Sequence, residues 1–498
     1  MAGRLQFQFD FSNTGKTGQR EGVRKRILIV GDYSAQNPDK PKLNDRKPHS
    51  VDVDDLDAVL RRITPQLRIV LDDSNEETLI EFRELDDFRP DALYKRLSVF
   101  KTLRDMRGRL ENPSTYTAAA GELKLGRGVA PTVTVADEPQ PAQTDTDANL
   151  FDRLLGGQSP ATERKTSPQL DTVQTLIQRL VAPHLSKGVD LGQQKQFLSA
   201  IDDSINQIMR SILHLPQFQA LEAAWRGVEW LVGNIEDNED LQLYLLDASL
   251  DELIQDIKAS GGQANKTAIY HLLTESSLAI PGGEPWSLVV GHYSFGEDAV
   301  TLSLLELLGA ISAGCGGVFV AGASPQLLGC ESIAAMPNAS DWTEPKTGIA
   351  QAWQLLRKSQ AAQYIGLAMP RFMLRLPYGK KSNPIDSFGF EEMPSRPNHE
   401  SYLWGNPALI CAELVARAWQ EGDGGEPGTL RDTGPLPFHI YDDGSGQAIK
   451  PCAEVYLNEK TANVIFEAGI IPVLSVRNHD HAIVPRLISI DEAATALV

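Results

Sequence analysis

The stretch that most constrains the fold is PQFQALEAAWRGVEWLV, which spans residues 216–232. Its apolar and aromatic side chains recur at steps of three and four, the spacing of a helix with one buried face. Its first residue is Pro216, and proline at the first helical position loses no backbone hydrogen bond. The residues on the apolar face are Phe218, Leu221, Trp225, Val228 and Leu231 or Val232. The stretch therefore predicts a core helix that begins near Pro216.

A pair of opposite charges lies beside this apolar face. Glu222 and Arg226 are four residues apart with the acidic residue first, which is the favourable order on a helix. In water such a pair contributes only about 0.2–0.5 kcal/mol to helix stability. If Trp225 and its neighbours exclude water, the guanidinium needs partners for its donors inside the protein. The residues alone leave both interpretations open, an incidental surface pair and a buried structural contact.

The same stretch resembles the signature of the large subunit of the type VI secretion system contractile sheath (TssC or VipB type), Phe-Gln-x-Leu-Glu-x-x-Trp-Arg-Gly-x-x-x-Leu-Val. The matching positions include Phe218, Leu221, Glu222, Trp225, Arg226 and Gly227. Further segments resemble this subunit in the family's order, namely GGEPWSLVVGHYSF, GGVFVAGASP, YIGLAMPRFMLRLPYG, FGFEE and SYLWGNPA. The similarity covers nearly all of residues 195–475.

An earlier part of the chain is similar to the small sheath subunit (TssB or VipA type). It contains the apolar strand RILIVG, the segment VDVDDLDAVL and a long amphipathic helix that begins at Pro90. In the family the two subunits are separate chains, so this chain fuses two family units. Between them the composition shifts to Ala, Gly, Pro, Thr and Asp, which predicts a linker.

The predicted organisation is therefore an N-terminal arm at 1–25, a small-subunit-like domain at 26–112, a linker at 113–168 and a large-subunit-like domain at 169–498. The last region begins with helices and continues with strands that alternate with helices. This order predicts an α/β class with a mixed or parallel sheet covered on both faces. The resemblance implies a phage-tail-sheath-like fold, with a helical N-terminal part in the larger unit.

The N-terminal sequence LQFQFDFS alternates between apolar and polar residues and predicts a strand. Its apolar face consists of Leu5, Phe7, Phe9 and Phe11. Such a strand must pair with something, either its own domain or the sheet of a neighbouring chain. The linker segment PTVTV, with Val133 and Val135, predicts a second short strand. Extended arms interlock protomers in the sheath family, so the resemblance favours pairing between chains.

A second charged group is predicted in the large unit. Arg371 and Arg375 are four residues apart in an apolar stretch bracketed by prolines, and Glu391 and Glu392 follow soon after. These four residues predict an ion-pair cluster. The sequence leaves open whether the cluster lies within the chain or across a subunit contact.

No motif predicts catalysis, a cofactor or a metal. Gly15-Lys16-Thr17 lacks the earlier glycine of a phosphate loop, and the glycine clusters at 282–283 and 314–317 precede strands instead of opening helices. His479 and His481 lack a third ligand, and the acidic residues at 52–57 suit the start of a solvated helix. The chain is therefore predicted not to be an enzyme, and a Rossmann-like nucleotide-binding enzyme is a remote alternative.

The charge balance argues against a nucleic-acid or anionic-membrane binder, because 47 basic and 66 acidic side chains give a net charge of −19. The four cysteines lack CxxC spacing, which suggests reduced core residues in a cytosolic protein. No apolar run is long enough to predict a membrane span, and no secretory signal is evident.

The resemblance implies a structural protomer of a contractile type VI secretion sheath in the bacterial cytoplasm, which forms a helical homopolymer and needs no cofactor. It further implies an inner-tube protein and baseplate components as partners. An unfoldase ATPase recycles sheaths of the family by gripping the N-terminal helix of the large subunit, an end that is fused to the linker here. The alternative is the sheath of a related contractile injection system or phage tail.

Overall fold

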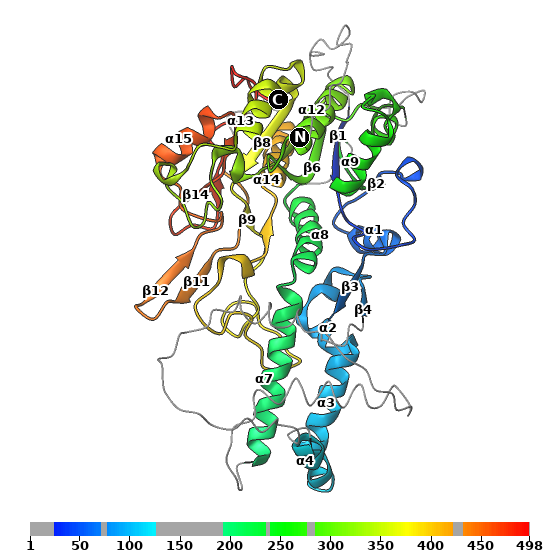
Figure 1. Cartoon of the computed structure of the whole chain (residues 1–498), viewed down its shortest axis with the longest axis vertical. Coiled ribbons are helices and arrows are strands. Elements are labelled where there is room, and N and C mark those ends of the chain that lie inside the picture. Colours follow the sequence, from blue (N-terminus) through cyan, green and yellow to red (C-terminus); the bar gives the residue numbers. More distant parts are fainter. Residues whose placement is uncertain are drawn as a thin grey trace, which may run out of the picture.

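One seven-stranded sheet forms the centre of the structure (Figure 1). The computed structural model describes residues 24–70, 77–125, 193–235, 240–275, 284–421 and 432–497. The strand order is β13-β8-β7-β6-β1-β5-β2, and all neighbours pair in parallel except β2, which is antiparallel to β5. The strands are β1 (Lys25–Gly31), β2 (His49–Ser50), β5 (Leu241–Asp247), β6 (Leu288–Phe295), β7 (Val318–Ala323), β8 (Ile365–Met369) and β13 (Ile471–Pro472).

Strand β1, the RILIVG strand, lies inside the sheet of the large-subunit-like part. It pairs with β5 on one side, where Ile27 faces Leu243, and with β6 on the other, where Ile27 faces Leu288. Its side chains are apolar on both faces, which suits a strand covered on both sides. The main strand of residues 26–112 therefore completes a sheet whose other strands, apart from β2, come from the second part, and the predicted division into domains stays a prediction.

Helices cover both faces of this sheet, as the α/β prediction requires. Ile27 and Ile29 of β1 pack into one core with helices α8 (Pro216–Asn234) and α14 (Ala408–Glu421). Leu28 and Val30 point into a second core, formed with α9, α12 and α13. The bounds of these helices are α9 (Leu250–Ala259), α12 (Ala299–Gly314) and α13 (Thr347–Arg357). The predicted α/β class with a mostly parallel sheet is confirmed.

The rest of the N-terminal part forms a hairpin and a set of helices. Strands β3 (Gln66–Val70) and β4 (Glu77–Glu81) pair antiparallel. The predicted long helix is interrupted at Leu97, whose extended backbone (ψ 135°) separates two helices. The helices of this part are α1 (Leu56–Ile63), α2 (Pro90–Arg96), α3 (Ser98–Glu111) and α4 (Tyr116–Leu125).

Helix α4 occupies residues that the composition assigned to the linker. It is tied to α3 by Arg109, which donates to Glu122 at 3.0 Å. Its buried alanines and Leu123 join the main core, so the folded part extends at least 13 residues beyond Asn112. The composition rich in small residues predicted a linker here, but alanine is also the strongest helix former. The remainder of the predicted linker up to residue 168 lies outside the described residues.

Helix α7 (Gln193–Leu213) runs beside α3 and forms an elongated arm below the sheet (Figure 1). Arg107 of α3 donates to Asp202 of α7 at 2.8 Å, and Gln194 donates to the carbonyl of Leu110 at 2.8 Å. These contacts join the segments that precede and follow the linker. The helical start predicted for the large-subunit-like part is thus packed against the small-subunit-like part.

The C-terminal third adds small elements around the sheet. Strands β9 (Phe372–Met373) and β10 (Trp404–Gly405) pair, as do β11 (His439–Asp442) with β12 (Gln447–Lys450) and β14 (Leu474–Ser475) with β15 (Ala482–Ile483). Helix α15 (Glu459–Glu467) packs near β13. The four cysteines are buried and unbridged. Among the helices of the described residues, none is long and apolar enough to cross a membrane.

Candidate functional site

Helix α8 forms a further contact between the two fused parts. Its Trp225 is fully buried, and the indole Nε1 donates to the backbone carbonyl of Tyr33, directly after β1, at 3.0 Å. The two rings meet edge to face with centroids 5.4 Å apart. Phe218, about two turns earlier on the same face of α8, packs against Phe82 and Phe88 of the N-terminal part. The predicted core helix therefore buries its aromatic face against the small-subunit-like segments.

Gly227 allows α8 to lie close to α14. A Cβ atom at this position would stand 2.6 Å from Cδ1 of Leu409, closer than real Cβ contacts. Leu221 of the same signature is also buried in this core. The small residue in the signature thus has a packing reason that one helix alone does not show.

Glu222 has a different partner from the one that helical spacing suggests. Its distance to Arg226 Nε is 4.0 Å, at the limit of an ion pair. Arg375, 153 residues away, instead donates through Nε and Nη2 at 2.8 and 3.1 Å. Arg226 donates to Glu229 at 2.8 Å and to the carbonyl of Leu85 at 3.2 Å. The bidentate pair between Glu222 and Arg375 ties α8 to the segment after β9, with the carboxylate fully buried.

Arg375 also pairs with Glu392, and this contact completes a buried network. The guanidinium donates through Nη1 and Nη2 to Glu392 at 2.9 and 3.3 Å. Glu392 further accepts the backbone amide of Tyr378 at 2.7 Å and lies 3.4 Å from His214 Nε2. Burial alone would raise the pKa of Glu392, but the charge of Arg375 and these hydrogen bonds lower it to about 2. One arginine is thus the shared hydrogen-bonding partner of two buried carboxylates.

The four residues of the predicted ion-pair cluster, Arg371, Arg375, Glu391 and Glu392, do not all lie in one group. Arg371 turns away and pairs with Glu454, at 2.9 Å through Nε, in a group that also contains His399. Glu391 accepts the backbone amide of Lys380 at 3.1 Å. In the structure Arg375 pairs with Glu392 and Glu222, and Arg371 pairs with Glu454. Glu222 and Glu454 were not among the four residues of the predicted cluster.

Depressed carboxyl pKa values predict acid sensitivity. Burial alone would also raise the pKa of Glu454, but the hydrogen bond from His399 and the charge of Arg371 lower this pKa to about 2. Because the folded pKa values lie below the ordinary value of 4.5, the stabilisation is complete above that value. We expect the urea midpoint of the protomer to fall as the pH is lowered from about 4.5 to about 2. Glu392→Gln should lower the midpoint at neutral pH and flatten this decline, and an unchanged decline would contradict the assignment.

A connection between β1 and β5 was not predicted as a site. Asp247, at the end of β5, accepts the backbone amides of Tyr33 and Ser34 at 2.8 and 3.0 Å. Arg46 donates to the carbonyl of Asp247 at 2.7 Å and to Glu252 at 3.0 Å. The sequence feature that could have indicated this site is an aspartate at the end of an apolar strand. The group holds the loop after β1 against the second part.

A cavity of about 740 Å³ opens at the carboxyl ends of β1, β5 and β6, where its lining includes Asp32, Ser249 and His292. Ligands of parallel α/β sheets bind at such an edge. A nucleotide site also needs a glycine-rich turn that opens a helix after the first strand, whereas β1 continues into a loop. Burial and the nearby Asp247 raise the pKa of Asp32. The geometry does not support the nucleotide-enzyme alternative.

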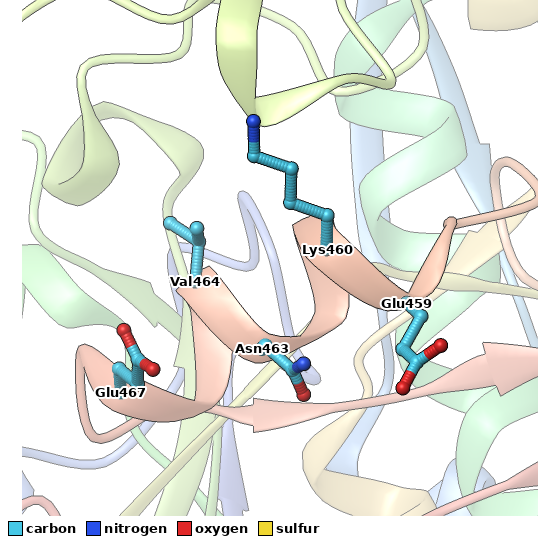
Figure 2. Close-up of a pocket in the computed structure, with 5 residues that line it drawn as sticks. All are labelled: Glu459, Lys460, Asn463, Val464 and Glu467. Carbon is cyan, nitrogen blue, oxygen red and sulfur yellow. The ribbon is translucent and has the colours of Figure 1, made fainter.

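A shallower hollow of about 400 Å³ lies over α15 and is lined by Glu459, Lys460, Asn463, Val464 and Glu467. Figure 2 shows these side chains spread along one helix and pointing in different directions. Ligand sites are concave and bring a few polar groups together. This hollow is therefore the solvent side of α15 and not a binding site.

The remaining candidate residues have structural surroundings. Asp52 accepts the amide of Asp55 at 2.7 Å, and Asp57 accepts that of Leu85 at 2.9 Å, as expected near a helix start. The rings of His479 and His481 lie 5.3 Å apart. Within the described ranges no group of His, Cys, Asp and Glu could hold a metal ion. Leu5, Phe7, Phe9, Phe11, Val133 and Val135 lie outside the described residues, so their strand pairing stays a prediction.

Comparison with known proteins agrees with the resemblance at both ends of the chain. Residues 195–490 match the VipB (EvpB) family, described as a tail sheath N-terminal domain. Residues 2–125 match the VipA family of the type VI secretion system, up to the last residue of α4. The type VI secretion system sheath protein TssC1 of Pseudomonas aeruginosa is 31% identical over 350 residues, which cover 68% of this chain and 70% of that protein.

Proposed function

Because the chain belongs to the type VI secretion system sheath family, with VipA-like and VipB-like parts in one polypeptide, we propose that it is a complete sheath protomer. In this proposal copies of the chain polymerise into a helical tube around an inner tube. The polymer then contracts and drives the inner tube through a target membrane. Its further partners are baseplate components and, for recycling, an unfoldase ATPase.

The observation that carries the proposal is the position of β1 between β5 and β6. It makes the VipA-like and VipB-like parts a single folded unit, so one chain supplies what two subunits supply elsewhere in the family. Identical units joined by a head-to-tail contact whose rotation does not close build an open helical polymer. Fusion would fix the ratio of the two parts at one to one in that polymer.

Contraction is proposed to draw on contacts between protomers. A polymer can store energy when its units have two packings that differ in free energy and assembly traps the less stable one. No nucleotide chemistry by the sheath is then needed, which agrees with the loop that follows β1. We therefore propose a structural role without enzymatic activity.

The N-terminal arm and the linker segment PTVTV are proposed to connect neighbouring protomers by strand addition. The described residues offer four two-stranded sheets, β3–β4, β9–β10, β11–β12 and β14–β15, outside the main sheet. A two-stranded sheet exposes unpaired backbone groups at its edges, which an extended segment can satisfy. The alternating strand with Phe7, Phe9 and Phe11 is the proposed donor, and the segment with Val133 and Val135 is a second.

Electron microscopy of the negatively stained chain tests the function. Hollow tubes of one width are expected, whereas single particles at every concentration would contradict the proposal. Deleting residues 1–12 should abolish the tubes and leave a folded protomer, because the strand donor is lost. As a matched pair, Phe7, Phe9 and Phe11 changed to Ser should prevent assembly, while Gln6, Gln8 and Asp10 changed to Ser should permit it. Normal tubes without residues 1–12 would refute the assignment of the arm.

A further inference from the structure

The hairpin of β11 and β12 extends from the body of the protein (Figure 1). None of its strand residues is buried, so apolar packing contributes little to its attachment. Two polar contacts lie where β11 begins and β12 ends. His439 Nδ1 is 2.8 Å from the hydroxyl of Tyr402, and Lys450 Nζ is 2.7 Å from Nδ1 of His399. Lys450 is therefore one of the side chains that hold the base of the hairpin.

Lys450 also begins a chain of three functional groups. His399 Nε2 lies 3.1 Å from Oε1 of Glu454. A carboxylate only accepts, so Nε2 carries the hydrogen and Nδ1 presents its lone pair to Lys450. Glu454 is held in turn by Arg371, through Nε at 2.9 Å and through the backbone amide at 3.0 Å. The order amine, imidazole and carboxylate is that of an activated nucleophile, its base and the group that orients the base.

The surroundings of Lys450 favour the neutral amine more than water does. Burial, together with the positive charge of Arg371, lowers its pKa to about 8 against the opposing attraction of Glu454 and Glu400. The amine stands 5.5 Å from the ring centre of Trp404. At neutral pH a lysine with this pKa is neutral in about a tenth of molecules, compared with fewer than about one in a thousand for an ordinary lysine.

Arg371 lies over the same ring as Lys450. Its guanidinium carbon is 5.9 Å from the ring centre of Trp404, and its side chain is 42% exposed. A guanidinium binds phosphate oxygens well because its donors match their geometry. A half-buried amine, an imidazole base and a solvent-accessible guanidinium thus meet at the base of one hairpin.

We propose that Lys450 is a nucleophilic lysine that acyl phosphates modify. Its Nζ lone pair attacks the carbonyl carbon, a C–N bond forms, and the C–O bond to phosphate breaks, with phosphate leaving as the anion beside Arg371. The Nζ proton passes to Nδ1 of His399, whose imidazolium form is stabilised by Glu454, and then to solvent. The product is an amide that carries no charge. It loses the ammonium contacts to His399 and Trp404, so acylation loosens the base of the hairpin.

Site-resolved mass spectrometry of the full chain treated with acetyl phosphate tests this proposal. Lys460, exposed on α15 (Figure 2), is the reference lysine. Near neutral pH the initial rate of acetylation at Lys450 should exceed that at Lys460 by about tenfold or more, and concentrated urea should abolish the difference. The rate at Lys450 should level off just above pH 8 in the folded chain, whereas in concentrated urea it should continue to rise towards pH 10, as for a lysine in water.

Two variants separate the roles. Lys450→Arg should remove the fast site without changing the rate at Lys460. His399→Asn should reduce the rate at Lys450 about a hundredfold, the lower end of the usual contribution of a general base, and leave the rate at Lys460 unaffected. The proposal is overturned if Lys450 in the folded wild-type chain reacts no faster than Lys460, or if its rate follows the pH profile of an ordinary lysine. Both measurements are made on the wild-type chain.

Discussion

Replacing Arg375 with methionine is expected to reduce the free energy of unfolding by about 3–5 kcal/mol, because removal of one partner leaves buried charges unpaired. Arg375 is the shared partner of Glu222 and Glu392, which are 0% and 1% exposed. Methionine fills a similar volume but offers no donor. Since whole domains are stable by only about 5–15 kcal/mol, this single change should strongly reduce the yield of folded protomer.

The control for this prediction is the same substitution at an exposed arginine. Arg68 lies 3.6 Å from Glu77 with both side chains about half exposed, so Arg68→Met should change stability by less than about 1 kcal/mol. Adding Glu222→Gln and Glu392→Gln to Arg375→Met should restore part of the loss, because the uncompensated charges are removed. Urea unfolding followed by tryptophan fluorescence measures all three proteins. Equal losses for the Arg375 and Arg68 variants would show that the network does not stabilise the fold.

Separating the two fused parts is expected to abolish folding of each. Strand β1 pairs with β5 and β6 of the other part, and its Ile27, Leu28 and Ile29 are fully buried there. Burial of three such side chains contributes roughly 5–9 kcal/mol, which is comparable with the whole stability of a domain. Residues 1–125 expressed alone should therefore be insoluble or unfolded by circular dichroism. Residues 193–498 alone should leave β5 and β6 unpaired where β1 belongs, and should aggregate.

Co-expression of the two fragments should restore a soluble complex of one copy each. The contacts that join the parts are non-covalent, so the linker is not required once both fragments are present at sufficient concentration. A protease site inserted near residue 140 offers the converse test, since cleavage of the folded chain should leave the fragments associated on size exclusion. A well-folded, soluble fragment 1–125 would contradict the interdependence of the two parts.

The signature in α8 illustrates what was predictable from residues. The spacing of Phe218, Leu221 and Trp225 predicted a buried helical face, and all three are buried. The similarity of the chain to the sheath family was also readable from contiguous motifs, and the family matches confirm it. Both inferences rest on patterns a few residues long, where neighbours along the chain are neighbours in space.

Partners far apart in sequence were beyond such patterns. Helical spacing assigned Arg226 to Glu222, but the carboxylate is fully buried and binds Arg375 instead, which can present two donors to it. Arg371 likewise binds Glu454 and not the nearby Glu391. The partner of each buried carboxylate depends on which hydrogen-bond donors the fold brings next to it. A buried carboxylate without such a donor would cost free energy, because water cannot replace the missing partner.

The sequence by itself therefore determined the core helix α8, the α/β class and the family, because periodicity and motif spacing are local properties. Only the tertiary structure decided that β1 completes the sheet of the second part, that Arg375 serves two buried carboxylates, and that Lys450 meets His399. The physical reason is the same in each case. Strand neighbours and ion partners are selected by packing and desolvation between segments that lie far apart in the sequence. A local sequence pattern does not encode that selection.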